Sequence, residues 1–454
     1  MGDFVSAIGS TMAYWITLNE VVFHKRGYSK LSCFRNDLQA HVQVYSLGLI
    51  FWLWSRPHYR CKDFKQDMID NLRNVAVPGT GIPLSVFCHS WWVCLFFVYF
   101  INPLICFMGA VNKVRKGSAA TGGRSVFKLY EEHLLHPQDW FSYWRLNCRL
   151  ASAHSLLLKP AGYNLEDKWT FLKEGADVGV PVSPFMEKQV DLVIKNKNVE
   201  GGLGIHFFKN AVHGGDWIFQ ERLHNAKWLN KMLPTPAPLS TMRVITSSSW
   251  TMGKHGHKVK EAKYRVYNRA GEVVEDETMG TVFNLDKQGS LAEAEKYIVA
   301  RSAVLRLGRA GAATDHSSVL FDVDINTGKV LQGTSNQQWY KLGLRQAAPG
   351  ACPWLPQGDG FTRHPDLDPT QPKIAGQSIP DMEKAREVVL LSHYKLLPDV
   401  PMVGWDVAFC ADGIYLLEVN LSCNFFRGTF AVPEYLSFVD EHFRDLEKRA
   451  NMGK

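Results

Sequence analysis

Several common catalytic motifs are missing from the chain, and each absence narrows its function. No Gly-Lys-Ser/Thr follows a strand-like run, which excludes the Walker A nucleotide loop, and no Gly-x-Ser-x-Gly or zinc motif points to a hydrolase or metalloprotease. The nine cysteines are scattered, with no Cys-x-x-Cys pair and no histidine at zinc spacing, which favours structural thiols in a reducing compartment. The net charge is +7, but no basic run is long enough to indicate nucleic acid.

Charge of either sign is absent from one long stretch near the N-terminus. No Asp, Glu, Lys or Arg occurs from Asn74 to Asn112, and residues 84–111 within it are almost wholly apolar. A membrane-spanning helix needs about 20 such residues. We expect a membrane-associated region whose basic C-terminal flank, under the positive-inside rule, places the rest of the chain in the cytoplasm. The alternative is a buried helical hairpin of a soluble protein.

The rest of the chain has the composition of a globular protein. Its 454 residues exceed one ordinary domain and suit two or three packed lobes. A Gly- and Ser-rich linker at 116–124 follows the apolar region. We predict an apolar helical region at residues 1–116 and a linker with a helical lead-in at 117–160. A lobe with a nucleotide flap at 161–230 and a catalytic lobe at 231–454 follow.

Residues 402–420, MVGWDVAFCADGIYLLEVN, predict a β-hairpin with an acidic site. Asp-Gly between two apolar runs is a strong hairpin signal. With residues 411–413 as the loop, Cys410 faces Ile414, and the same register sets Asp406 opposite Glu418.

Residues two apart on a strand share a face, so Asn420 joins the two carboxylates. Oxygen ligands of this kind suit Mg²⁺. The alternative is a surface hairpin whose polar face meets water.

A second pattern predicts a phosphate-binding flap. Residues 191–195 read as a short strand that ends in Lys195, residues 205–208 resume the apolar character, and glycines lie between them at Gly201, Gly202 and Gly204. Backbone amides in such a turn approach phosphate oxygens without interference from Cβ atoms. The lysine adds a compact positive charge, although most glycine turns are only turns.

The hairpin and four further segments carry a resemblance to a known family. Gly-Trp-Asp-x-Ala followed by Leu-Glu-x-Asn is similar to the metal-binding end of ATP-grasp enzymes. The other segments resemble one branch, the sugar-transfer-associated ATP-grasp proteins; they are Asp191–Gly204, Phe219–Thr246, Leu305–Lys329 and His364–Pro380. The resemblance implies an α+β fold in which two lobes clasp a nucleotide, with ATP and Mg²⁺ as cofactors.

The resemblance also assigns roles to individual residues. Lys195 and Lys168 would bind phosphates, and the hinge between the lobes would bind adenine and ribose through Gln220, Glu221 and Leu223. The loop AATDH corresponds to a family loop that typically reads Asp-Asn, so only Asp315 is carried over and His316 departs from the pattern.

Two arginines, Arg243 and Arg306, lie within apolar, strand-like runs. An unpaired buried charge is very costly, so each must pair with an anion or face a cavity. We expect contacts to phosphate or to a substrate carboxylate, with Arg306 nearer the chemistry; structural salt bridges are the alternative.

The reaction implied by the resemblance is a ligation. ATP activates a carboxylate as an acyl-phosphate, which an amine then attacks, and the substrates would be small molecules or glycan-linked acids and amines. Two alternatives stay open: an ATP-grasp kinase that phosphorylates an alcohol, and an ATP-binding scaffold that does not turn over.

Overall fold

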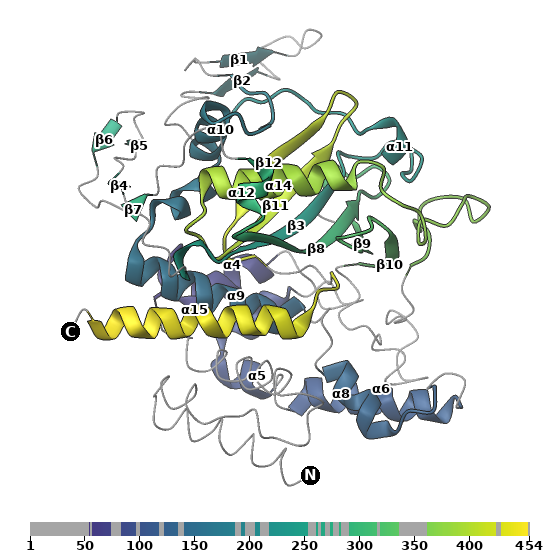
Figure 1. Ribbon diagram of the computed structural model, residues 1–454. Coiled ribbons are helices and arrows are strands. Elements are labelled where there is room, and N and C mark those ends of the chain that lie inside the picture. The colour runs from purple at the N-terminus through teal and green to yellow at the C-terminus, as the bar shows by residue number, and fades with distance from the viewer. Residues whose placement is uncertain are drawn as a thin grey trace.

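The computed structural model describes residues 54, 57–73, 83–96, 100–117, 122–134, 140–186, 192–195, 205–208, 218–252, 260–261, 265–267, 273–275, 281–282, 290–315, 318–335, 361–423 and 428–452. The fold is α+β, as predicted, and its centre is a six-stranded antiparallel sheet in the order β10-β9-β8-β3-β11-β12 (Figure 1).

The strands of this sheet come from the second half of the chain. They are β3 (Thr241–Ser248), β8 (Ile298–Leu307), β9 (Val319–Val323), β10 (Val330–Ser335), β11 (Met402–Phe409) and β12 (Ile414–Asn420). Short two-stranded pairs accompany it: β1 (Leu192–Lys195) with β2 (Ile205–Phe208), β4 (Lys260–Glu261) with β7 (Thr281–Val282), and β5 (Arg265–Tyr267) with β6 (Val273–Glu275).

The helices precede, follow and separate these strands. The N-terminal part holds α4 (Phe64–Leu72), η2 (Leu84–His89), α5 (Trp91–Phe96), α6 (Asn102–Arg115), α8 (Val126–Leu134), α9 (Trp140–Leu158), η4 (Ala161–Glu166) and α10 (Lys168–Asp177). Later come α11 (Lys227–Asn230), η5 (Trp250–Met252), α12 (Leu291–Ala294), α14 (Met382–Leu396) and α15 (Val432–Met452).

The hairpin of β11 and β12 forms where the sequence predicts it, with one difference in register. Asp406 lies opposite Glu418, as predicted. The prediction that Cys410 faces Ile414 is wrong, because Phe409 pairs with Ile414. A register shift between Asp406 and the next residue compensates for the longer turn, so the two carboxylates still face each other.

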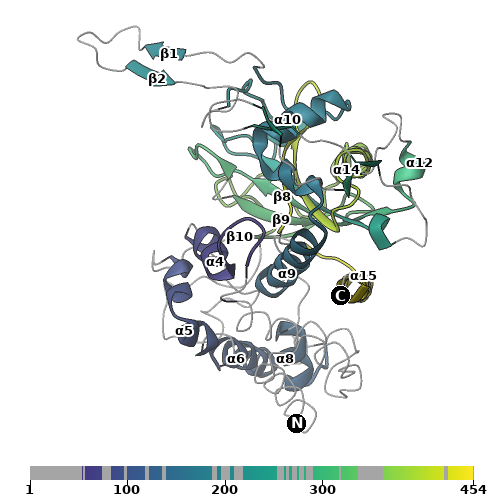
Figure 2. The same cartoon turned by 90° about the vertical axis from the view of Figure 1, so that its left-hand side faces the viewer.

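One face of the sheet packs against α14 and α10 (Figure 2). Alternate residues of β11 point into this core, and Trp405 is fully buried there with Val403 and Val407. The indole of Trp405 donates to the Thr246 hydroxyl at 2.8 Å. Alternation along β11 therefore directs Gly404 and Asp406 to the opposite face.

The opposite face is half covered by α9 and α15, with α4 beside them (Figures 1 and 2). Ile245 of β3 and Met402 of β11 meet aromatic residues from these helices, among them Tyr143 and Tyr435. The core shared by these elements joins the N-terminal helices to the sheet. Nearer the other end of the same face, the sheet carries charged side chains in place of apolar ones.

The apolar stretch at 84–111 is divided in the structure. It forms η2, α5 and the first part of α6, and Pro103 stands in the first turn of α6, where its missing N–H is tolerated. Within the described ranges, no helix has both the length and the apolar character needed to cross a membrane.

The predicted flap is present as a hairpin. β1 pairs with β2 in antiparallel register, and Lys195 at the end of β1 lies opposite Ile205. This hairpin stands away from the central sheet, beyond α10 (Figure 2). Gly201, Gly202 and Gly204 lie outside the described residues.

Candidate functional site

A cluster of charged side chains spans neighbouring strands on the face of the sheet that carries Gly404. Arg243 of β3 lies opposite Asp406 of β11, and its Nε donates to Asp406 Oδ1. Arg306 of β8 reaches the other oxygen, with Nη1 at 3.5 Å from Asp406 Oδ2. Both arginines and the aspartate are largely buried. The two arginines singled out in the sequence therefore share one carboxylate.

Asp315 completes the pairing of Arg306. Its Oδ2 accepts from Arg306 Nη2 at 2.7 Å and Nε at 3.1 Å, and from the Thr241 hydroxyl at 2.6 Å. The loop that follows β8 thus folds back over the strand end. The neighbouring His316, where the sequence departs from the family pattern, lies outside the described residues.

Glu418 lies next to this buried group and is more open to solvent. Its Oε2 is 3.0 Å from the ammonium of Lys168, the first residue of α10. Its Oε1 accepts from the Asn420 side-chain amide at 3.4 Å. The side chain of Glu418 is 29% exposed and that of Lys168 is 65% exposed. These residues form the accessible rim of the cluster.

A glycine makes room for the buried pair. A Cβ on Gly404 would lie 2.7 Å from the Cβ of Cys423 and 3.1 Å from Nη1 of Arg243. The first distance is shorter than any comfortable carbon–carbon contact, so the guanidinium and the chain after β12 can approach β11 only at a residue without a side chain.

The electrostatics of the cluster are balanced. Arg243, Arg306 and Lys168 supply three positive charges, and Asp315, Asp406 and Glu418 supply three negative ones. Burial alone would raise the pKa of Asp406, but the two guanidiniums outweigh it and the pKa is lowered. Asp406 is therefore ionised at neutral pH.

The three predicted Mg²⁺ ligands, Asp406, Glu418 and Asn420, differ in how well they could bind the ion. Glu418 and Asn420 present oxygen-bearing groups at a partly exposed edge, which fits a hydrated Mg²⁺ that takes one or two carboxylates. Rotation of the Asn420 amide about its last side-chain bond would present its oxygen to a bound cation. Asp406 differs, because both of its oxygens already contact guanidinium groups.

The hinge residues lie along a different segment. Gln220 forms a single bridge with Phe185, its side chain donates to the Ser183 hydroxyl, and the Glu221 N–H donates to the Pro184 carbonyl at 3.0 Å. Gln220 and Glu221 are exposed and Leu223 is half-buried.

Gln220 pairs with Phe185, and the residues shortly before Phe185, at 181–182, run beside Leu416 of β12. The hinge residues are thus joined to the sheet edge that carries Glu418. The contacts of Gln220 and Glu221 described above are with residues 183–185 and do not reach the charged cluster, and the Lys195 side chain lies outside the described part of the structure.

Sequence reasoning missed the residues that fix the chain after β12. Glu166, at the end of η4, accepts from the Leu421 N–H at 2.7 Å and from the Tyr59 hydroxyl at 2.8 Å. Asn147 of α9 donates to the Cys423 carbonyl at 2.9 Å. These contacts join segments 107 to 276 residues apart, so no local pattern announces them.

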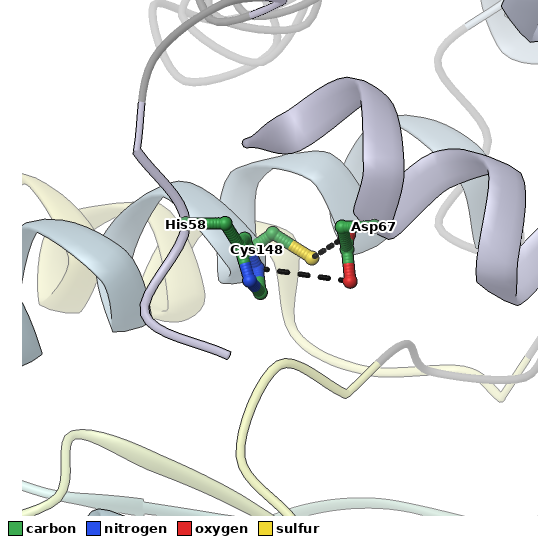
Figure 3. A group of neighbouring side chains, drawn as sticks. All are labelled: His58, Asp67 and Cys148. Carbon is green, nitrogen blue, oxygen red and sulfur yellow. Dashed lines mark hydrogen bonds and ion pairs between the residues drawn. The ribbon is translucent and has the colours of Figure 1, made fainter. Parts of the chain in front are cut away.

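A second group of buried side chains, His58, Asp67 and Cys148, has ligand atoms close enough to hold a metal ion (Figure 3). His58 Nε2 is 3.7 Å and Cys148 Sγ is 3.9 Å from the two oxygens of Asp67. However, Asp67 is also contacted by two arginines. Arg60 lies 2.7 Å from it and Arg145 lies 3.4 Å from it. Two guanidiniums at one carboxylate repel a cation, so this group is best explained as an ion-pair cluster that joins α4 to α9.

Comparisons with protein-family models, with curated proteins and with solved structures found no match to the chain.

Proposed function

We propose that the chain is an ATP- and Mg²⁺-dependent ligase of the ATP-grasp type, which joins a carboxylate to an amine. The observation that carries the proposal is the cluster on the sheet face. Arg243, Arg306, Asp406 and Glu418 come from four strands, and Lys168 joins them from α10. Basic and acidic groups gathered on one face of the sheet suit a reaction in which phosphate charge must be bound and neutralised.

Each group has a distinct role in this proposal. Lys168 and Lys195, with the glycines of the flap, hold the phosphates, and Gln220, Glu221 and Leu223 hold the nucleoside. Glu418 and Asn420 bind Mg²⁺ together with the phosphates.

The buried residues of the cluster act on the acid substrate. Arg306 is the more exposed of the two arginines, so it meets the substrate carboxylate, and Arg243 fixes Asp406 from behind. Asp315 and Asp406 orient Arg306 through ion pairs on both sides of its guanidinium.

The reaction balances without an activated serine or cysteine. A carboxylate oxygen attacks the γ-phosphorus of ATP, the bond to the β-phosphate oxygen breaks, and ADP leaves. The amine then attacks the acyl carbon, an amide forms, inorganic phosphate leaves and one proton is lost from nitrogen. Positioning and charge neutralisation supply the acceleration in both steps. A glycan-linked acid or amine is the substrate class that the resemblance suggests.

One observation favours a second candidate, the ATP-binding scaffold without turnover. Both oxygens of Asp406 are engaged by arginines, so this carboxylate does not bind Mg²⁺ while both ion pairs last. In the ligase Asp406 orients Arg306, and Mg²⁺ binds at Glu418 and Asn420. In a scaffold no substrate reaches Arg306 and the ion pairs are permanent.

Product analysis tests the proposal. Purified full-length protein is incubated with ATP, Mg²⁺ and pooled carboxylates and amines, and ADP and phosphate are measured separately. The ligase predicts equal amounts of both, dependent on an acid and an amine, and a hydroxamate when hydroxylamine replaces the amine. A kinase releases ADP without phosphate, and a scaffold releases neither.

Arg306→Lys is the informative variant in this assay. It keeps the charge but loses the planar fork that contacts two carboxylates. Loss of turnover with retained ATP binding supports a role at the acid substrate. Full turnover in this variant contradicts it.

A further inference from the structure

Helices α5 and α6 turn their large apolar side chains outward. The exposed residues on α5 are Trp92, Val93 and Phe96, and those on the first half of α6 are Leu104, Phe107 and Met108. Their side chains are 36% to 63% exposed. On each helix the spacing is one, three or four residues, so these side chains share one helix face.

The other side of α6 is the one that packs inward. Cys106 and Ala110 are almost completely buried, and α6 packs against α8. On α8 the same division holds, since Leu129 is buried and Phe127 is 66% exposed. Phe107 also meets Tyr130 of α8, with the ring centroids 6.0 Å apart, so it serves both this packing and the outer surface.

The charge around this face is mainly positive. No Asp or Glu occurs from residue 74 to residue 130, and two acidic residues, Glu131 and Glu132, follow in the second half of α8. The basic residues of the same stretch follow the apolar ones directly; they are Lys113, Arg115, Lys116, Arg124 and Lys128. Those at the end of α6 are partly or fully exposed. We call the exposed apolar residues of α5, α6 and Phe127, together with these cations, the apolar–basic face.

We propose that the apolar–basic face binds the surface of a bilayer that contains anionic phospholipid. Aromatic and aliphatic side chains next to an excess of cations complement acyl chains beneath negative headgroups. A protein partner of mixed charge would leave some of the cations unmatched.

The location of this face suits such a role. Helices α5, α6 and α8 lie at the end of the molecule far from the β1–β2 hairpin, with the sheet between them (Figures 1 and 2). A molecule bound to a membrane through this face keeps the charged cluster of the sheet accessible. The inference does not depend on the reaction proposed above.

Flotation with lipid vesicles tests this proposal on the full-length protein. One set of vesicles contains phosphatidylcholine alone, and the other contains phosphatidylcholine with about a third phosphatidylserine. We expect binding to the second set that falls as salt rises. Phe96→Ser with Leu104→Ser, which changes the two most exposed apolar residues of α5 and α6 after Trp92, should lower the vesicle-bound to free ratio by about tenfold or more.

A charge variant gives an independent reading that does not alter apolar surface. Lys113→Gln with Lys116→Gln should lower binding to the anionic vesicles by about fivefold per charge and leave binding to neutral vesicles unchanged. Val299→Ser with Leu331→Ser, which removes exposed apolar residues on the sheet, is the matched control and should bind like wild type.

Three results would overturn the proposal. The first is that wild type does not bind anionic vesicles, and the second is that both apolar–basic face variants bind as well as wild type. The third is that wild type forms dimers or larger assemblies and Phe96→Ser with Leu104→Ser abolishes them, which assigns the face to a second copy of the chain.

Discussion

The two facing carboxylates of the hairpin should respond very differently to the same chemical change. Asp406→Asn removes the anion that two buried guanidiniums share, and breaking a buried ion pair from one side costs roughly 3–5 kcal/mol. Glu418→Gln removes the partner of the exposed Lys168, and such pairs contribute roughly 0–1 kcal/mol. Residues directly opposite each other in the sheet should therefore differ several-fold in their contribution to the free energy of unfolding.

Thermal and urea denaturation, followed by circular dichroism, measure this difference. At roughly 2–4 °C per kcal/mol for a domain of about 200 residues, Asp406→Asn should lower the melting temperature by about 10 °C. Glu418→Gln should lower it by no more than about 3 °C under the same rule. Equal losses for the two variants would refute the reasoning, as would an unchanged melting temperature for Asp406→Asn.

A double variant separates the loss of the buried ion pair of Asp406 from other effects of the single substitution on stability. Arg243→Met together with Asp406→Asn removes both members of the buried pair and leaves Arg306 on Asp315, so part of the lost stability should return. If the two changes add, Asp406 does not hold Arg243 through the contact seen here.

The pH dependence follows from the lowered pKa of Asp406. A carboxyl group whose pKa is lower in the folded state adds stability above its ordinary pKa of about 3.9, and that stability is lost as pH falls through the folded-state pKa. The difference in unfolding free energy between wild type and Asp406→Asn should stay constant from about pH 5 to 8 and shrink in more acidic solution.

The remaining predictions concern four other positions. Lys168→Ala should weaken ATP binding with little change in stability, because its ion pair is exposed, whereas Lys173→Ala on the same helix should bind ATP like wild type in calorimetry. Gly404→Ala should lower the melting temperature through its clash with Cys423, and an unchanged value would refute the close approach. Burial raises the pKa of Asp399 to about 7. Because a raised carboxyl pKa costs stability as pH rises from about 4 through 7, Asp399→Asn should gain up to a few kcal/mol over wild type across that interval, measured by urea denaturation.

The position of Asp406 opposite Glu418 was predictable, because it depends on local sequence signals. Asp-Gly between apolar runs fixes a hairpin, and alternation then places Asp406 and Glu418 on one face. The position of the turn was predicted one residue off, since the sequence does not reveal the register shift beside Asp406. Arg243 and Arg306 were recognised as needing an anion, because buried charge must be paired.

The missed features are those that depend on contacts between distant segments. Neither the pairing of Arg243 with Asp406 nor the bond of Leu421 to Glu166 leaves a mark on local sequence. The division of the apolar stretch was harder to predict, because an uncharged run gives no period that separates a spanning helix from shorter ones. Pro103 stands in the first turn of α6, where a proline is compatible with the start of a helix.

The most direct test of the central claim is calorimetric titration of ATP into the full-length protein, with and without Mg²⁺, for wild type and Glu418→Gln. The account predicts ATP binding that Mg²⁺ strengthens in the wild type, and loss of that strengthening in a Glu418→Gln protein of near wild-type stability. No ATP binding by folded wild type, or the same Mg²⁺ dependence in both proteins, would contradict the assignment of this sheet edge as a nucleotide and metal site.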